Sequence, residues 1–116
     1  MLEAQTPLTT AMFNVLLALA DGDRHGYAIL KEVEEQTGGE VQLSTGTLYG
    51  IIKRLLEDGW IVEAQRRPAA ANDDQRRRYY RLTDAGREVA VAEALRMEKL
   101  LARARNKHLF KALKPA

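Results

Sequence analysis

Two short extended runs are embedded in a chain whose apolar residues otherwise recur at helical spacing. The runs Trp60–Arg66 and Arg77–Leu82 contain aromatic and β-branched residues, and the polar, alanine-rich loop Pro68–Gln75 separates them. Two such runs predict a β-hairpin with a long loop. The chain is therefore expected to be mainly α-helical with one small β-hairpin, to which Val41–Leu43 could add a short third strand.

Three helical segments precede this hairpin. The first is expected to begin at Thr6 and Pro7, because a hydroxyl side chain followed by proline is typical of a helix start. The second is predicted over Gly26–Gln36, and the third follows a capping Ser44 and stops before Gly59. Apolar residues at intervals of three and four give each helix a face for the core: Met12, Phe13, Leu16, Leu17, Leu19, Ala20, Tyr27, Ile29, Leu30, Val33, Leu48, Ile51, Ile52 and Leu55.

A long helical segment follows the hairpin. Thr83 and Asp84 are suited to cap it, and the helical pattern continues to about Ala112. A helix of about 30 residues is longer than a domain of this size needs for its own core. Its apolar residues form a seam with nearly the spacing of a packed helix pair: Ala90, Ala94, Met97, Leu101 and Ala104. The length and the seam predict that this helix crosses a second copy of itself and also packs on the first helix.

Positive charge is concentrated in one part of the chain. The net charge is only +2, from 18 basic and 16 acidic residues. The segment from Arg66 to Arg81, however, contains six arginines and only two aspartates, so this segment carries a net charge of +4 and the rest of the chain −2. Concentrated basic charge favours a partner that carries phosphate. A solvated arginine-rich loop would have the same composition, so charge alone leaves both interpretations open.

The composition excludes several classes of protein. There is no cysteine, and His25 and His108 lie near opposite ends, so we expect no disulfide, no metal site and no cofactor. The uncharged stretch Ala4–Ala20 is too polar to span a membrane, and we expect an intracellular protein, cytoplasmic or nucleoid-associated. We expect no enzyme activity, because acidic residues lie on polar helix faces and no nucleophile motif or phosphate-binding glycine loop is present.

The order of elements is that of a winged helix-turn-helix, in which the third helix enters the major groove of DNA and the hairpin lies along the backbone or minor groove. With Leu48 at the centre of its buried face, the third helix turns five residues outward: Gly46, Thr47, Gly50, Lys53 and Arg54. Each helical glycine costs roughly 1 kcal/mol relative to alanine. Close approach of the backbone to DNA would explain both glycines, and so would packing between helices.

Three blocks of residues stand out in order along the chain: His25-Gly26-Tyr27; Thr45–Tyr49 with Lys53-Arg54-Leu55 and Glu57-Asp58-Gly59; and Arg77–Thr83 with Gly86. Together they resemble the PadR-like transcriptional regulators. The resemblance runs from about Phe13 to Arg87, and the single long C-terminal helix is similar to the small subclass of that family, in which this helix makes the dimer. Gly50 departs from the family, in which many members carry proline at that position.

The resemblance implies a homodimeric repressor that binds adjacent major grooves of a palindromic DNA operator. Residues 1–83 would form the winged helix-turn-helix domain and residues 84–116 the dimerisation helix, in one compact unit. The implied DNA-binding residues are Ser44, Thr45, Thr47, Tyr49, Lys53, Arg76 and Arg77. The expected dimer interface contains Met12, Phe13, Leu16, Ala94, Met97, Leu101 and Ala104. Family members often respond to phenolic or drug-like compounds, so a small hydrophobic effector is expected at the dimer interface, where Met97 lines a cavity or is plain core.

Several roles stay open on sequence alone. His25 either lies near a DNA phosphate or caps and packs its own helix, and Trp60 is either core or a surface on which a ligand stacks. Tyr79, Tyr80 and Leu82 are expected to be structural. A winged helix used only for protein–protein contact would keep the same fold, although it would not need arginines in its wing.

Overall fold

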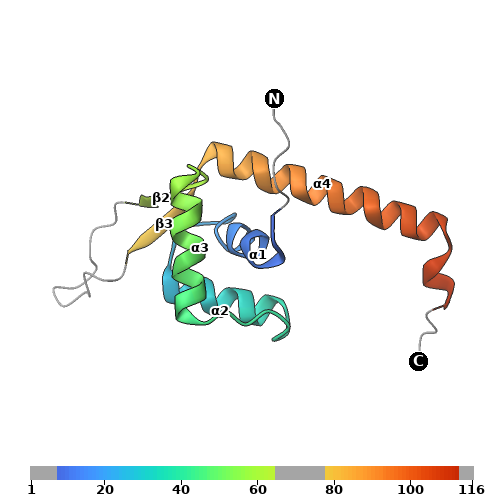
Figure 1. Ribbon diagram of the computed structural model, residues 1–116, viewed down its shortest axis with the longest axis horizontal. Coiled ribbons are helices and arrows are strands. Elements are labelled where there is room, and N and C mark those ends of the chain that lie inside the picture. The colour runs from blue at the N-terminus through green and yellow to red at the C-terminus, as the bar shows by residue number, and fades with distance from the viewer. Residues whose placement is uncertain (1–7, 65–77, 113–116) are drawn as a thin grey trace.

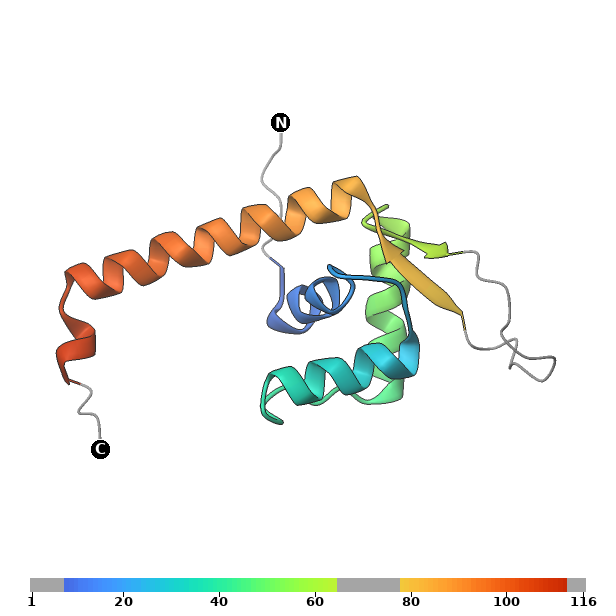
Figure 2. The same cartoon turned by 180° about the vertical axis from the view of Figure 1, so that it is seen from behind.

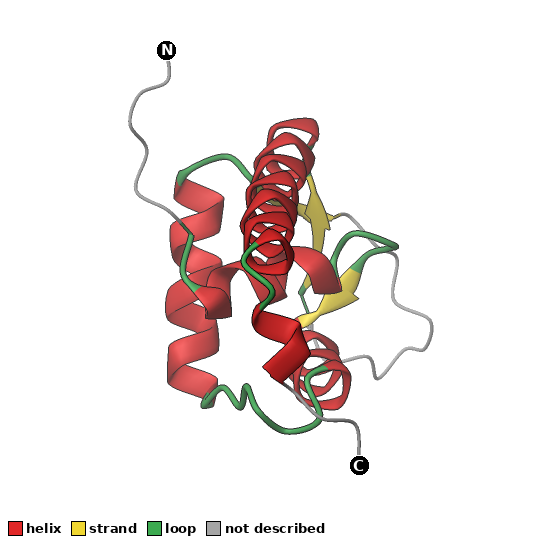
Figure 3. Cartoon of the chain, turned by 90° about the vertical axis from the view of Figure 1, so that its right-hand side faces the viewer, coloured by secondary structure: helices red, strands yellow, loops and turns green. Residues whose placement is uncertain are grey.

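The computed structural model describes residues 8–64 and 78–112. Within these residues, four α-helices and a three-stranded antiparallel sheet confirm the expectation of a mainly helical chain with a small hairpin (Figure 1). Figure 3, seen nearly along the last helix, shows the strands gathered at one side of the helices. The elements are α1 (Thr10–Ala18), β1 (Arg24–His25), α2 (Gly26–Gln36), α3 (Thr45–Glu57), β2 (Ile61–Ala64), β3 (Tyr79–Leu82), α4 (Asp84–Asn106) and the 3-10 turn η1 (Leu109–Ala112).

The helix starts follow from capping side chains. Ser44 and Thr83 cap α3 and α4 as expected, each by accepting a backbone N–H bond from the residue three positions later. The expected start of α1 at Thr6 and Pro7 is wrong, and both residues lie outside the described part of the chain. Thr9 is the cap instead, because its hydroxyl accepts a 3.0 Å hydrogen bond from the amide of Met12.

The core lies between the first three helices, with the sheet and the start of α4 packed against them. Most of the expected apolar residues are buried, but Leu17 and Tyr27 are exposed, which corrects two expectations. In α2 the buried residues are Gly26, Ile29 and Val33, at helical intervals of three and four. Tyr27 is one residue past Gly26 and two before Ile29, so its side chain points away from that face.

The third strand comes from a different segment than expected. Val41–Leu43 is not a strand: the amide of Val41 donates instead to the hydroxyl of Thr37, at 3.0 Å. The extra strand is β1, which pairs antiparallel with β3 and brings His25 opposite Tyr79. The strand order is therefore β1-β3-β2, with β3 in the centre. Two residues of regular pairing leave no periodicity in the sequence, so β1 could not be seen there.

Helix α4 is shorter than expected. It ends at Asn106 instead of continuing to Ala112, because His108 adopts a left-handed backbone with φ of 61° and the chain turns into η1. The N-terminal part of α4 packs on α1, and its C-terminal part extends away from the body (Figures 1 and 2). The molecule is accordingly elongated, with extents of 57 × 42 × 23 Å.

Candidate nucleic-acid interface

Helix α3 has one buried and one exposed face. Leu48, Ile52 and Leu55 point into the core, whereas Thr45, Gly46, Thr47, Gly50, Lys53 and Arg54 are exposed, as the sequence predicted for the outward positions. The start of the helix is ordered by Ser44, whose hydroxyl accepts from the amide of Thr47 at 3.1 Å and donates to its hydroxyl at 2.9 Å. The exposed face therefore presents short hydroxyl side chains at its first turn and a lysine two turns later.

Gly46 and Gly50 lie on this exposed face without a covering element. A Cβ atom built on either glycine meets no atom of the described residues within 4 Å. Packing between helices of one chain therefore does not explain these glycines, although it was an open alternative. They leave a smooth strip of backbone along the face that carries Thr47 and Lys53.

Tyr49 differs from its neighbours on α3. Its side chain is 44% exposed, yet the ring lies against Gly26 at the start of α2. A Cβ on Gly26 would come within 2.8 Å of the ring carbon Cζ and closer still to the hydroxyl oxygen. Tyr49 was expected to contact DNA, and its packing on Gly26 was not predicted from the sequence.

The wing is formed by β2 and β3, paired from Ile61 opposite Leu82 to Ala64 opposite Tyr79. Arg76 and Arg77, the expected wing contacts, lie outside the described residues. The two arginines of the basic segment that the structure does describe are both ion-paired. Arg78 lies 3.4 Å from Glu63, and Arg81 donates two hydrogen bonds to Asp23, at 3.1 and 2.9 Å, which raise its pKa above the ordinary value.

His25 is a capping residue. Its Nδ1 accepts a 3.2 Å hydrogen bond from the amide of Ala28, so it closes the start of α2, and its ring packs edge-on against Tyr79 with centroids 5.3 Å apart. This outcome matches the capping alternative. Trp60 is half-buried against the core, and Tyr80 is buried, which raises the pKa of its phenol.

Two arginines close the C-terminal end of α1, a feature that the sequence analysis missed. Arg24 donates to the carbonyl oxygen of Ala18 at 2.7 Å, and Arg87 of α4 donates to that of Ala20 at 3.0 Å. A guanidinium at the negative end of a helix dipole is a favourable placement. Arg87 thereby ties α4 to the loop that leads into β1.

The residues expected at the dimer interface fall into two groups. Met12, Phe13 and Leu16 are buried in the core of the chain itself. Ala94, Met97 and Leu101 are exposed along the C-terminal part of α4, and Ala104 is half-buried. Leu95, Leu100, Leu109 and Phe110 add further exposed apolar surface nearby.

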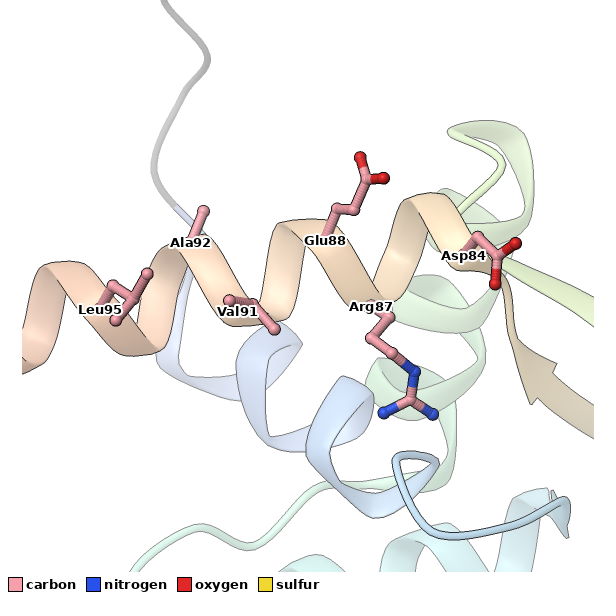
Figure 4. Close-up of a pocket in the computed structure, with 6 residues that line it drawn as sticks. All are labelled: Asp84, Arg87, Glu88, Val91, Ala92 and Leu95. Carbon is pink, nitrogen blue, oxygen red and sulfur yellow. The ribbon is translucent and has the colours of Figure 1, made fainter.

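A shallow depression, open to solvent, also lies along the N-terminal part of α4 (Figure 4). Its walls are Asp84, Arg87, Glu88, Val91, Ala92 and Leu95, and Met97 is not among them. Within residues 8–64 and 78–112, no group of acidic and histidine side chains is arranged to hold a metal ion. None of the described helices is both long and apolar enough to cross a membrane.

The chain has three helices followed by a hairpin of a small sheet, and the third of these helices has an exposed polar face. This arrangement defines a winged helix-turn-helix protein. Residues 15–92 match the model of the transcriptional regulator PadR-like family. The chain belongs to this family.

Relatives and solved structures agree. The chain is 40% identical over 93 residues to an uncharacterized 37.1 kDa protein in transposon TN4556 of Streptomyces fradiae, covering 80% of this chain but only 24% of that protein. It is 33% identical to the transcriptional regulator Rv3488 of Mycobacterium tuberculosis, over 75% of each chain. A crystal structure of a PadR family regulator from Clostridium difficile superposes with a TM-score of 0.69 at 25% identity, covering 87% of this chain and 99% of that one.

A fourth comparison concerns the fold alone. Bacillus subtilis PadR, solved in complex with operator DNA, superposes with a TM-score of 0.61 at 23% identity, over 72% of this chain and 46% of that one.

Proposed function

We propose that this protein is a sequence-specific DNA-binding repressor that acts as a homodimer on a palindromic operator inside the cell, in the cytoplasm at the nucleoid. The exposed face of α3 is the observation that carries this proposal. It combines a capped first turn, two uncovered glycines and the side chains of Thr45, Thr47 and Lys53. A major groove admits a helix with such a face, and the fold neighbour from Bacillus subtilis was solved with operator DNA.

The proposal divides the DNA contacts between two elements. Ser44, Thr45, Thr47 and Lys53 of the α3 region reach base edges and nearby phosphates. Arg76 and Arg77 contact the DNA backbone, where arginine positions a protein without reading sequence. Because Arg78 and Arg81 are already paired with carboxylates, they contribute less to phosphate binding than the charge of the segment suggests.

The dimer forms through α4, so residues 1–83 bind DNA and residues 84–116 hold two copies together. Ala94, Met97, Leu101 and Ala104 lie near the two-fold axis, and the exposure of the first three in the single chain supports this placement. Leu16 is completely buried in its own chain, so Met12, Phe13 and Leu16 support α4 from inside rather than meet the partner. Leu17, 46% exposed on α1, is available for that contact.

A small hydrophobic or phenolic effector would release the repressor from DNA by binding at the dimer interface. Met97 is 38% exposed on the seam, where a flexible side chain suits a cavity between two copies. The test is to add simple phenolic acids and planar hydrophobic amines to the protein–DNA complex. Release of the duplex supports an effector, whereas unchanged binding with every compound contradicts it.

The DNA-binding proposal is tested with a duplex that the wild-type protein selects from a random pool, compared with a shuffled duplex over a range of salt concentrations. Arg77→Ala should weaken binding to both duplexes alike and lower the salt slope by about two per dimer. Thr47→Ala should cost roughly 1–3 kcal/mol on the selected duplex and little on the shuffled one. If the wild-type protein selects no duplex, the winged helix serves another purpose, such as protein–protein contact.

A further inference from the structure

The contact between Gly26 and Tyr49 joins three parts of the fold. Gly26 begins α2, the Tyr49 ring from the second turn of α3 lies on it, and β1 directly before it pairs with the wing strand β3. The backbone angle of Gly26 is one that any residue can adopt, because its φ is not positive. Glycine is needed here for space: an added Cβ would meet the Tyr49 hydroxyl, Cζ at 2.8 Å and Cε1 at 3.3 Å.

The surroundings of this contact hold both helix starts in place. His25 caps α2 and packs on Tyr79 of β3, while Ser44 caps α3. Tyr80, buried beside them, is close enough to Tyr49 for the two phenols to interact electrostatically. The ring of Tyr49 therefore connects the second turn of α3 to the start of α2, next to β1, which pairs with the wing strand β3.

We propose that Tyr49 is a positioning residue, whose ring rests on Gly26 as a spacer and sets the angle of α3 relative to α2 and the wing. The inference rests on the proposed DNA-binding function. With this spacer in place, Thr47 and Lys53 reach the bases while the wing contacts the DNA backbone and holds the protein in position. A change in the spacer tilts α3, so it reduces discrimination between sequences more than it reduces binding itself.

The experiment combines space-adding and space-removing variants of this pair: Gly26→Ala, Tyr49→Phe, Tyr49→Leu and the double variant Gly26→Ala/Tyr49→Leu. Each is titrated with the duplex selected by the wild-type protein and with its shuffled version, and thermal unfolding is recorded without DNA. Gly50→Ala is the folding control, because its Cβ meets nothing within 4 Å and should raise the unfolding temperature.

We expect Gly26→Ala to lower the ratio of the two affinities by about tenfold, with the affinity for the shuffled duplex changed by less than about threefold. Tyr49→Phe keeps the ring and should keep the ratio within about threefold, whereas Tyr49→Leu should lose it. In the Tyr49→Leu background, Gly26→Ala should have no further effect on the ratio or on the unfolding temperature, because the clash has been removed.

Four outcomes overturn the inference. If Tyr49→Phe loses as much discrimination as Tyr49→Leu, discrimination depends on the hydroxyl and the ring is no spacer. If Gly26→Ala lowers the affinity ratio or the unfolding temperature as much in the Tyr49→Leu background as in the wild-type protein, the two positions are not coupled. If Gly26→Ala fails to fold, the comparison of Tyr49→Phe with Tyr49→Leu still tests the inference. A wild-type protein that selects no duplex overturns the proposed function as well, whereas a selected duplex with an unaltered ratio in Gly26→Ala overturns only the positioning role.

Discussion

The two halves of α4 belong to one continuous helix but have different surroundings. In the N-terminal half, Gly86, Ala90 and Glu93 are buried, and Arg87 donates a hydrogen bond to the loop after α1. In the C-terminal half, Met97, Leu100 and Leu101 are each more than a third exposed, although they are no less apolar. Helical periodicity thus shows that α4 has an apolar face, but not whether its own chain or a partner covers it.

Glu93 marks the boundary between the halves. It is the one charged residue buried among the described residues, and its carboxylate accepts a 3.1 Å hydrogen bond from Nε of Arg96. That hydrogen bond holds the pKa of Glu93 below its ordinary value, against the opposing effect of burial. Beyond this pair, Met97 and Leu101 on the face that continues toward Ala104 are not covered by any of the described residues of the body.

The largest effect is expected where the N-terminal half touches the sheet. A Cβ on Gly86 would lie 2.9 Å from the carbonyl carbon of Trp60 and nearer still to its oxygen, and backbone cannot move aside as a flexible side chain can. Gly86→Ala should therefore lower the free energy of unfolding by about 3 kcal/mol. Urea denaturation measures this, with Gly50→Ala as the matched control that should gain up to about 1 kcal/mol. Equal stability of the two variants would mean that α4 does not pack so closely.

In the C-terminal half of α4, charged substitutions on the exposed seam should disrupt the dimer. The double variant Met97→Asp/Leu101→Asp places two carboxylates on the seam of each copy, which should weaken the dimer by about 100-fold or more. Light scattering should give twice the chain mass for the wild-type protein and the chain mass for the variant, with the helical circular dichroism of the body retained. Leu56→Asp is the control, because Leu56 and Met97 are equally exposed, at 38%. A wild-type monomer would show that no second copy covers the seam.

The boundary residue should give a smaller, pH-dependent effect. Because the pKa of Glu93 is lowered in the folded protein, its ion pair stabilises the fold above the unfolded pKa of about 4.3, and this stabilisation is lost as the pH falls through the folded pKa. Glu93→Gln should thus cost about 1 kcal/mol at pH 7, and this cost should shrink as the pH falls below about 4. Urea unfolding of both proteins at several pH values tests this; a cost that does not depend on pH would indicate that shape, not charge, is what the site needs.

Much of the fold could be predicted because strong local patterns specify it. The bounds of α2 and the Ser44 cap of α3 agree with the sequence analysis, since a periodic face and a capping residue are readable without tertiary context. The strand β1 is only two residues long, and its pairing with β3 arises from a contact more than fifty positions away. The end of α4 at Asn106 depends on the left-handed backbone of His108, which cannot be predicted from a histidine at that position.

The candidate site was less predictable than the fold. The outward face of α3 follows from periodicity, and the structure places Thr45, Thr47 and Lys53 there. The packing of Tyr49 on Gly26 could not be derived, because it depends on how closely two helices approach. A signal did exist: a glycine at the first position of α2 that no turn or positive φ requires. The ion pair of Arg81 with Asp23 was equally hidden, since the partners are 58 residues apart.

The smallest effect concerns the far end of α4. His108 has a left-handed backbone, which glycine adopts at lower cost, and η1 folds back so that Arg105 lies 5.3 Å above the ring of Phe110. His108→Gly should stabilise this turn by less than about 1 kcal/mol after the greater freedom of glycine in the unfolded chain is subtracted.

This gain appears in the free energy of global unfolding only if the C-terminal half of α4 unfolds together with the body. If the proposed partner holds the seam, we expect the gain in the wild-type background and none in the Met97→Asp/Leu101→Asp background, in which the C-terminal half would open on its own. An equal gain in both backgrounds, measured by urea unfolding, would show that the chain itself holds both halves of α4.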